Sequence, residues 1–231
     1  MHRLILWSLG LVFCTAAHAL TIIDLELATP LSSPTYTFYS YTATTGEQET
    51  NIPIGPYTTY LTGGSYNDTQ VQAFCYDLNN PTDVGTTYQG TLNTPTDPSD
   101  MEATYLINQI NVLEKGNNLP LATQGAIDFA IWQIMNASSN NPSNPFPDDP
   151  TSQSWITQAQ TAVTDGWWTA ADSAVYPVWE PTSANSGVQR FGLILPGTSP
   201  VPTPEPGTCV LIGLGMIGLS LALRRKRRQV D

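Results

Sequence analysis

Histidine and cysteine are scarce in this chain and almost missing from its central part. The 231 residues include two histidines and three cysteines, and most of these lie near the two ends. The terminal ones are His2, His18, Cys14 and Cys209. Residues 20–204 therefore hold no histidine and a single cysteine, Cys75. Ser–His–Asp or Cys–His catalysis, Cys/His metal binding and an internal disulfide are excluded for this stretch. We predict no cofactor.

Positive charge is almost as rare in the central part. Residues 20–204 contain seventeen acidic side chains and two basic ones, Lys115 and Arg190, which gives a net charge of −15. So acidic a surface repels the phosphates of nucleic acids and of anionic membranes. Hydrophobic residues nevertheless make up 41% of the chain, enough to form a core. The sequence predicts an acidic folded domain that does not bind nucleic acid.

The N-terminus has the three parts of a secretory signal peptide. Arg3 supplies a basic start, an apolar run begins at Leu4, and Ala17 and Ala19 form a small-x-small cleavage site. We predict a signal peptide over residues 1–19, with an uncleaved anchor as the alternative. The rest of the chain is then exported.

The C-terminus combines an apolar run with a basic cluster. Residues 208–223 are apolar apart from Thr and Ser, and they predict a transmembrane helix. The tail 224–231 follows, and its basic residues are Arg224, Arg225, Lys226, Arg227 and Arg228. Because basic flanks stay on the cytoplasmic side of a membrane, the acidic domain should lie outside.

A short motif precedes the apolar run. Pro204, Glu205 and Pro206 lie at the end of a Pro-rich linker, residues 197–207, and the apolar run and basic tail follow. In this order the three features resemble the PEP-CTERM sorting signal of Gram-negative bacteria that make extracellular polysaccharide. The resemblance implies an exosortase as partner and a final location at the cell surface or in the extracellular matrix.

The intervening residues 20–196 predict one α+β domain. Strands are expected at TIIDLELA, YTFYSYTAT, YTTYLT, VQAFCYDL, TTYQGTL, AVYPVWEP and VQRFGLIL. In VQAFCYDL, alternation puts Val71, Ala73 and Cys75 on one face and Phe74 and Tyr76 on the other. We predict β-sandwich or barrel-like strands with an inserted three-helix subdomain.

The three helices are expected between residue 97 and the last two strands. A capping-box pattern from Ser99 to Glu102 indicates that the first helix begins there and runs to Leu113. The second covers LPLATQGAIDFAIWQIMNA, and the third starts after Pro150. The residues expected to face inward are Ala126 or Ile127, Ala130, Ile131 and Ile134 in the second helix, and Trp155, Ile156, Ala159 and Ala162 or Val163 in the third.

FCYDL and AIDFAIWQIM, in this order and separation, resemble the thioester-domain family of bacterial surface proteins. In that family a cysteine attacks a glutamine carboxamide, ammonia leaves, and the buried thioester can acylate an amine on a partner. The resemblance covers about residues 71–136 and places Cys75 at the cysteine position.

Two registers differ in where they place the family's glutamine. Aligned on Ala-Ile-Trp at 130–132, the position holds Asp128, which has no amide to expel, and no thioester is expected. Aligned on Thr-Gln-Gly-Ala-Ile at 123–127, the glutamine is Gln124, and Asp128 takes the tryptophan position. Gln124 and Asp128 are four residues apart, so they lie on the same face of the helix. The tryptophan register is favoured because the indole would anchor the helix in the core. Cys75 is then a small buried hydrophobe.

Other side chains suggest different functions. Five acids could pair for glycoside hydrolysis but are more typical of helix starts: Asp97, Asp100, Glu102, Asp148 and Asp149. Trp167, Trp168 and Trp179 could stack on sugars or pack in the core. We predict a non-enzymatic surface or matrix interaction module whose partners are polysaccharide or surface proteins. The alternatives are a covalent adhesin with a Cys75–Gln124 thioester and an exopolysaccharide hydrolase.

Overall fold

The structure is a computed structural model that describes most of the predicted α+β domain. The described ranges are 21–30, 35–39, 48–53, 56–76, 82–116, 119–137, 150–185 and 187–203. The predicted signal peptide, the sorting residues from Pro204 onward, the predicted membrane helix and Asp148–Asp149 lie outside these ranges. Among the described helices, none is both long and apolar enough to cross a bilayer.

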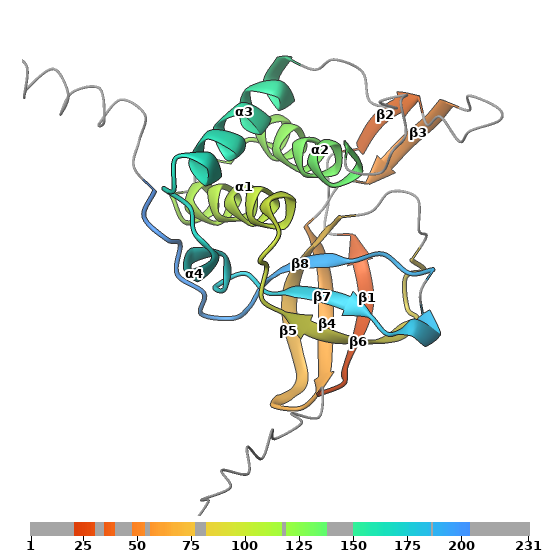
Figure 1. The fold of residues 1–231 in the computed structure, drawn as a ribbon. Coiled ribbons are helices and arrows are strands. Elements are labelled where there is room, and N and C mark those ends of the chain that lie inside the picture. Colours follow the sequence, from red (N-terminus) through yellow and green to blue (C-terminus); the bar gives the residue numbers. More distant parts are fainter. Residues whose placement is uncertain are drawn as a thin grey trace, which may run out of the picture.

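The described elements alternate in blocks along the chain (Figure 1). They are β1 (Ile23–Pro30), β2 (Thr35–Tyr39), β3 (Gln48–Pro53), β4 (Tyr57–Gly63), β5 (Tyr66–Cys75), β6 (Thr87–Asn93), α1 (Pro98–Lys115), α2 (Leu121–Ala137), α3 (Pro150–Thr164), α4 (Ala170–Ser173), β7 (Val178–Pro181), a 3₁₀ turn (Ser183–Asn185) and β8 (Phe191–Ile194). The predicted α+β class, with helices inserted between strands, is confirmed. Strand β3, helix α4 and the 3₁₀ turn were not expected from the sequence.

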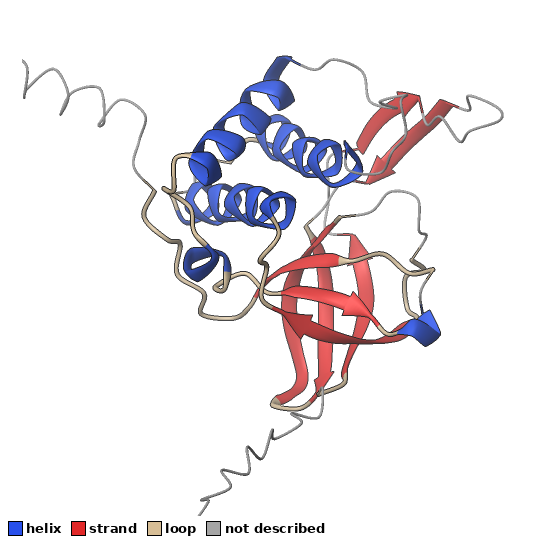
Figure 2. Cartoon of the chain, viewed as in Figure 1, coloured by secondary structure: helices blue, strands red, loops and turns tan. Residues whose placement is uncertain are grey.

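Six of the strands close into an antiparallel barrel in the order β1-β4-β5-β8-β7-β6 (Figure 2). The last pairing, between β1 and β6, joins strands from opposite ends of the first β block. Strands β2 and β3 form a separate two-stranded sheet. Closure leaves no free edge among the six strands, which removes sites for unwanted strand pairing. The barrel therefore replaces the sandwich as the form of the β part.

Strand β5 connects the barrel to the helices, as its alternating sequence predicts. Val71, Ala73 and Cys75 are buried in the barrel core, whereas Phe74 and Tyr76 are buried against the helices. Both faces of this strand end are therefore apolar and enclosed. The last residues of β5 lie where the two parts of the domain meet.

Helix α1 begins earlier than its sequence pattern suggested. It starts at Pro98, with Asp97 as an N-cap that makes no side-chain cap hydrogen bond. Ser99 therefore lies inside the first turn, and the predicted capping box from Ser99 to Glu102 is wrong. Proline fixes φ near the helical value and lacks an N–H, so the first helical position suits it. The proline signal outweighed the Ser–Glu spacing.

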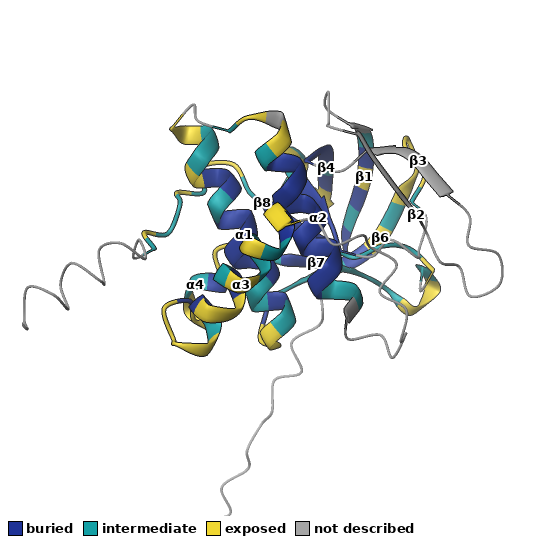
Figure 3. Ribbon diagram, turned by 90° about the horizontal axis from the view of Figure 1, so that it is seen from above, coloured by how far each residue is buried: buried dark blue, intermediate teal, exposed yellow. Residues whose placement is uncertain are grey.

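Helices α2 and α3 bury the stripes that their periodicity predicts. Ile127, Ala130, Ile131 and Ile134 of α2 are all buried. Figure 3 shows α2 largely in the dark blue of buried residues. In α3, Ala159 and Ala162 are buried, while the partly buried Trp155, Ile156 and Val163 pack against the same helical core. Helices α1–α3 lie together against one end of the barrel (Figure 1).

Two of the candidate sugar-stacking tryptophans are core residues. Trp168 is 1% exposed and its Nε1 donates to Thr104 Oγ1 at 3.2 Å. Trp179 is fully buried in the barrel, and its Nε1 donates to the carbonyl of Ile23 at 2.9 Å. The core-packing interpretation holds for both, since each indole has its polar edge satisfied inside the fold. Trp167 is 36% exposed.

The first part of the predicted linker is attached to the domain. We call residues 197–203 the C-terminal strap. Asn108 Nδ2 donates to the carbonyl of Val201 at 3.0 Å, and the Val201 N–H donates to Asn108 Oδ1 at 2.8 Å. Lys115 Nζ also donates to the carbonyl of Thr198 at 2.6 Å. The chain therefore follows α1 as far as Thr203, immediately before Pro204.

Candidate functional site

Cys75 is the last residue of β5 and is 4% exposed. Its thiol Sγ lies 2.9 Å from Oε1 of Gln189 and donates a hydrogen bond to it. A carbonyl carbon is bonded about 1.23 Å from its oxygen, so the carboxamide carbon of Gln189 lies within about 4 Å of the sulfur. A buried thiol and a side-chain amide are thus brought together.

Strand register explains why Gln189 reaches Cys75. In the antiparallel β5–β8 pair, Cys75 lies opposite Phe191. The Tyr76 N–H donates to the carbonyl of Arg190 at 3.0 Å, which continues the pairing beyond β8. Gln189 is two residues from Phe191 and so lies on the same face, diagonally across from Cys75.

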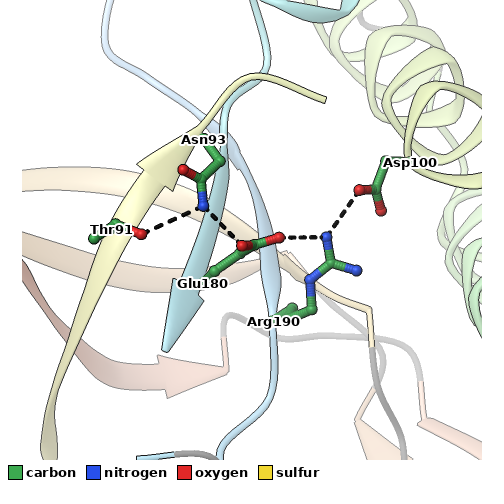
Figure 4. A network of polar contacts seen from close by, with 5 residues as sticks. All are labelled: Thr91, Asn93, Asp100, Glu180 and Arg190. Carbon is green, nitrogen blue, oxygen red and sulfur yellow. Dashed lines mark hydrogen bonds and ion pairs between the residues drawn. The ribbon is translucent and has the colours of Figure 1, made fainter. Parts of the chain in front are cut away.

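Arg190 fixes the segment that carries Gln189 (Figure 4). Its Nη2 donates to Asp100 Oδ2 of α1 at 2.8 Å and to Glu180 Oε1 of β7 at 2.7 Å. Asn93 of β6 donates to the other oxygen of Glu180 at 2.8 Å. Arg190 is the residue before β8, and its guanidinium thereby connects this point of the chain to β7 and to the first turn of α1.

The charge of Arg190 is stabilised by these partners. Burial alone would lower its pKa, but the hydrogen bond and charge of Asp100, together with Glu180, outweigh burial and raise it. The guanidinium also lies 5.9 Å from the ring centroid of Tyr76, the residue after Cys75. Burial, with a contribution from Asp100, raises the pKa of the Tyr76 phenol above its usual range, and Arg190 opposes this rise. Arg190 remains a cation and Tyr76 a neutral phenol.

Helix α2 contacts Cys75 through Trp132. The indole Nε1 donates to the carbonyl of Cys75 at 2.9 Å, and Trp132 is 2% exposed. Trp132 and Phe129 both belong to the barrel core, although they come from a helix. The expectation that this indole anchors the helix in the core is confirmed. It also fixes the backbone of the cysteine.

Tyr57 and Asp128 complete the surroundings of the thiol. Tyr57 pairs with Ala73 in β4–β5, which puts its side chain on the same sheet face as Cys75. Burial raises the pKa of the Tyr57 hydroxyl above its usual range, and the nearby Cys75 and Asp128 raise it further. The tyrosine therefore interacts electrostatically with both residues. We call Tyr57, Cys75, Asp128 and Gln189 the thiol cluster.

Asp128 is enclosed in an unusual way for a carboxyl group. It is 4% exposed, and within the described ranges neither carboxyl oxygen has a hydrogen-bond partner. Burial first, and then the negative charge of Glu114 on α1, raise the pKa of Asp128 well above its usual range. Burial and the charge of Glu114 thus both favour the protonated form of Asp128.

The structure pairs Cys75 with a glutamine that sequence reasoning missed. Gln124 is buried on α2, one turn before Asp128, and its N–H donates to the carbonyl of Pro120 at 3.0 Å. Its role as an acyl partner stays a prediction, whereas Gln189 accepts a hydrogen bond from the thiol. Gln189 is 114 residues from Cys75 in the sequence. The sequence contains one weak indication of its importance. It precedes Arg190, one of two basic residues in the domain, at the start of a predicted strand.

The other candidate carboxylates have structural contacts or lie elsewhere. Asp100 is paired with Arg190, and Asp97 stands at the N-cap of α1. Burial raises the pKa of Glu102 on the same helix. In the part of the chain that the structure describes, no three His, Cys, Asp or Glu side chains are grouped to hold a metal ion.

Comparisons with known proteins found one sequence motif and one similar solved structure. Residues 202–228 match the PEP-CTERM protein-sorting motif. This motif implies that the protein is exported and processed by an exosortase. No curated protein is significantly similar in sequence to the chain. Among solved structures, the N-terminal thioester domain of a surface protein from Clostridium perfringens is similar, at 12% sequence identity and a TM-score of 0.40. The match covers 78% of this chain and all of that domain.

Proposed function

We propose that this protein is an exported, non-enzymatic surface-attachment module whose Cys75 and Gln189 form an internal thioester. The observation that carries the proposal is the 2.9 Å contact between the buried thiol and the Gln189 carboxamide oxygen. This is the covalent-adhesin alternative from the sequence, with a different glutamine. The sorting motif supplies its route out of the cell.

The reaction joins two groups that the fold already holds together. The sulfur of Cys75 attacks the carboxamide carbon of Gln189, the S–C bond forms, and the C–N bond breaks. The thiol proton leaves with the nitrogen as ammonia, so no oxidant or cofactor is needed. Fixed proximity replaces a bimolecular encounter, which is the main advantage of such an arrangement. Burial of Cys75 keeps water from hydrolysing the product.

An exposed primary amine on a surface polymer or protein is the partner that this bond would accept. The amine attacks the acyl carbon, becomes an amide of Gln189, and frees the Cys75 thiol. The module is consumed in one event, which distinguishes it from an enzyme that turns over. A hydrolase has less support, since Asp100 is engaged by Arg190 in an ion pair of 2.8 Å.

Intact-mass spectrometry of the exported domain tests the proposal. The wild-type domain should be lighter than its sequence by one ammonia, about 17 Da, and should incorporate methylamine. The variant Gln189→Glu keeps the side-chain shape but has no amide to expel, so it should show the full sequence mass and a free thiol. The matched variant Gln124→Glu should retain the mass loss.

Two results would contradict the proposal. A wild-type domain at its full sequence mass means that Cys75 is a buried thiol and the module acts non-covalently. A mass loss that survives Gln189→Glu and disappears in Gln124→Glu assigns the acyl group to Gln124 instead.

A further inference from the structure

The C-terminal strap begins at a turn that sets the direction in which the chain leaves β8. The Thr198 N–H donates to the carbonyl of Leu195 at 3.1 Å, and Gly197 has a φ of +78°. Pro196 and Gly197 take the two central positions of this turn, an order that fits a type II turn, whose third residue has a positive φ that suits glycine. The local sequence therefore directs the strap back over the domain.

Helix α1 binds the strap chiefly through its main chain. The Asn108 side chain pairs with both main-chain groups of Val201, at 3.0 Å to the carbonyl and 2.8 Å to the N–H. Lys115 Nζ bonds a further main-chain group, the carbonyl of Thr198. The Val201 side chain packs against the helical core. Main-chain pairing combined with one packed side chain is the way in which protein surfaces recognise peptide segments, so α1 holds the strap as a bound peptide.

The strap overlaps the sorting motif in sequence. The motif match spans residues 202–228 and the strap spans residues 197–203, so Pro202 and Thr203 belong to both. Gln109 Nε2 of α1 donates to Thr203 Oγ1 at 3.3 Å. The folded domain therefore contacts the first residues of the signal that directs its own processing.

We propose that the docked strap withholds the start of the sorting motif from the exosortase, so that the strap must leave α1 before the chain is processed. An enzyme that acts on a peptide segment binds main-chain groups, and α1 already occupies both of those of Val201. Only residues 204–207 separate the strap from the predicted membrane helix, and they extend over at most about 14 Å. A domain with a docked strap therefore takes up the space that an enzyme at the motif needs.

Release of the strap does not require the domain to unfold. The strap is a surface segment outside the helices and strands, and such segments open locally at a small free-energy cost. Release frees the seven residues 197–203, which adds at most about 25 Å between the domain and the membrane. When opening and closing are fast compared with cutting, the population of the open form sets the rate of processing. Weakening the strap from the α1 side should therefore speed processing without changing any residue of the motif.

The test measures two rates on the full chain. Pulse-chase labelling in a Gram-negative host that makes an exosortase gives the rate of processing, and hydrogen exchange of the strap amides in the purified precursor gives the extent of opening. The double variant Gln109→Ala with Lys115→Ala removes two contacts of the strap, and both rates should rise about fivefold, as expected for loss of a typical hydrogen bond. The matched control is Gln158→Ala, which removes a hydrogen bond to Ser154 within α3 and should change neither rate.

A second variant weakens the strap from its other end. Gly197→Ala puts a side chain at a positive φ, which strains the turn, and it should raise both rates in the same direction. If the double variant fails to fold by circular dichroism, Gly197→Ala decides by the same outcomes.

Two results would overturn the proposal. Faster exchange of the strap with unchanged or slower processing means that docking does not hold the motif back. Unchanged exchange means that these contacts do not hold the strap. Neither result bears on the proposed thioester of Cys75 and Gln189, which the ammonia mass loss tests separately.

Discussion

Two buried polar clusters of this domain have opposite hydrogen-bonding states. The strap cluster consists of Asn108, Asn111, Tyr176 and the backbone of Val201. The Tyr176 hydroxyl donates to Asn108 Oδ1 at 2.7 Å and accepts from Asn111 Nδ2 at 3.0 Å, while Asn108 also pairs twice with Val201. In the thiol cluster, by contrast, Asp128 has two oxygens without partners among the described residues.

The difference indicates what each cluster is for. A buried network in which every polar group is hydrogen-bonded stabilises one arrangement of the chain, which is a structural role. A buried acid without a hydrogen-bond partner reduces stability, and such groups concentrate at reactive sites. The strap cluster therefore fixes the exit of the chain toward the sorting motif, and the thiol cluster provides the reactive group. Variants in each cluster should have separable effects on stability and on acyl chemistry.

The largest loss of stability is expected from Asn108→Ala. The change leaves the Val201 backbone and the Tyr176 hydroxyl without their partner, and the free energy of unfolding should fall by about 2–4 kcal/mol. Chemical denaturation measures this loss. The side chain of the neighbouring Gln109 donates to Thr203 Oγ1 at 3.3 Å, a weaker contact, so Gln109→Ala should cost less than about 1 kcal/mol. Equal losses in the two variants would mean that the strap cluster is not a distinct stabilising unit.

An intermediate effect is expected from Arg190→Lys. Lysine keeps the charge but is shorter and more strongly hydrated, so its ammonium should hold Asp100 and Glu180 less well, and the free energy of unfolding should fall by about 1–2 kcal/mol, a figure reduced for the part of Arg190 that is exposed. Because Arg190 follows Gln189, the fraction of domain with the ammonia mass loss should also decrease. Lys115→Ala, which removes the other basic residue and its hydrogen bond to Thr198, serves as control and should leave the ammonia mass loss unchanged. Full mass loss in Arg190→Lys would show that the ion pairs do not position Gln189.

The smallest effect is expected from Asp128→Asn, which should change the slope of the free energy of unfolding against pH. A raised folded-state pKa contributes stability below the ordinary carboxyl pKa, and this contribution is lost as pH rises through the folded value. Relative to Asp128→Asn, the free energy of unfolding of the parent should therefore fall with pH, by at most about 1.4 kcal/mol per pH unit. Both proteins should carry Cys75→Ala, so that no acyl bond contributes. Parallel stability curves would contradict a buried neutral Asp128.

Local sequence patterns predicted the individual strands and helices of this fold better than they predicted the closure of the barrel. Alternation in β5 assigned Val71, Ala73 and Cys75 to one face correctly, because a two-residue period is a property of the strand itself. The periodic stripe of α2 was predicted for the same reason. Barrel closure depends on the pairing of Ile23 with Gly90, between strands distant in sequence, and no local pattern carries that information.

The sequence predicted about half of the candidate site. Cys75 and Trp132 were identified because each belongs to a short motif with its own local context. Gln189 was missed because its contact with Cys75 arises from the register of β5 and β8, set by pairs such as Cys75 with Phe191. Asp128 was singled out from the sequence as a position that departs from a pattern. Its unpaired carboxyl oxygens depend on the packing of α2 against α1 and the barrel.

The most direct test of the central claim is to locate methylamine in the domain by peptide mass spectrometry. After treatment of the folded protein, the thioester between Cys75 and Gln189 predicts a methylamide on Gln189 and a free thiol on Cys75. Gln124 should remain unmodified in the same sample. Methylamide on Gln124, or a domain that takes up no methylamine and retains an unmodified Gln189, would contradict the account.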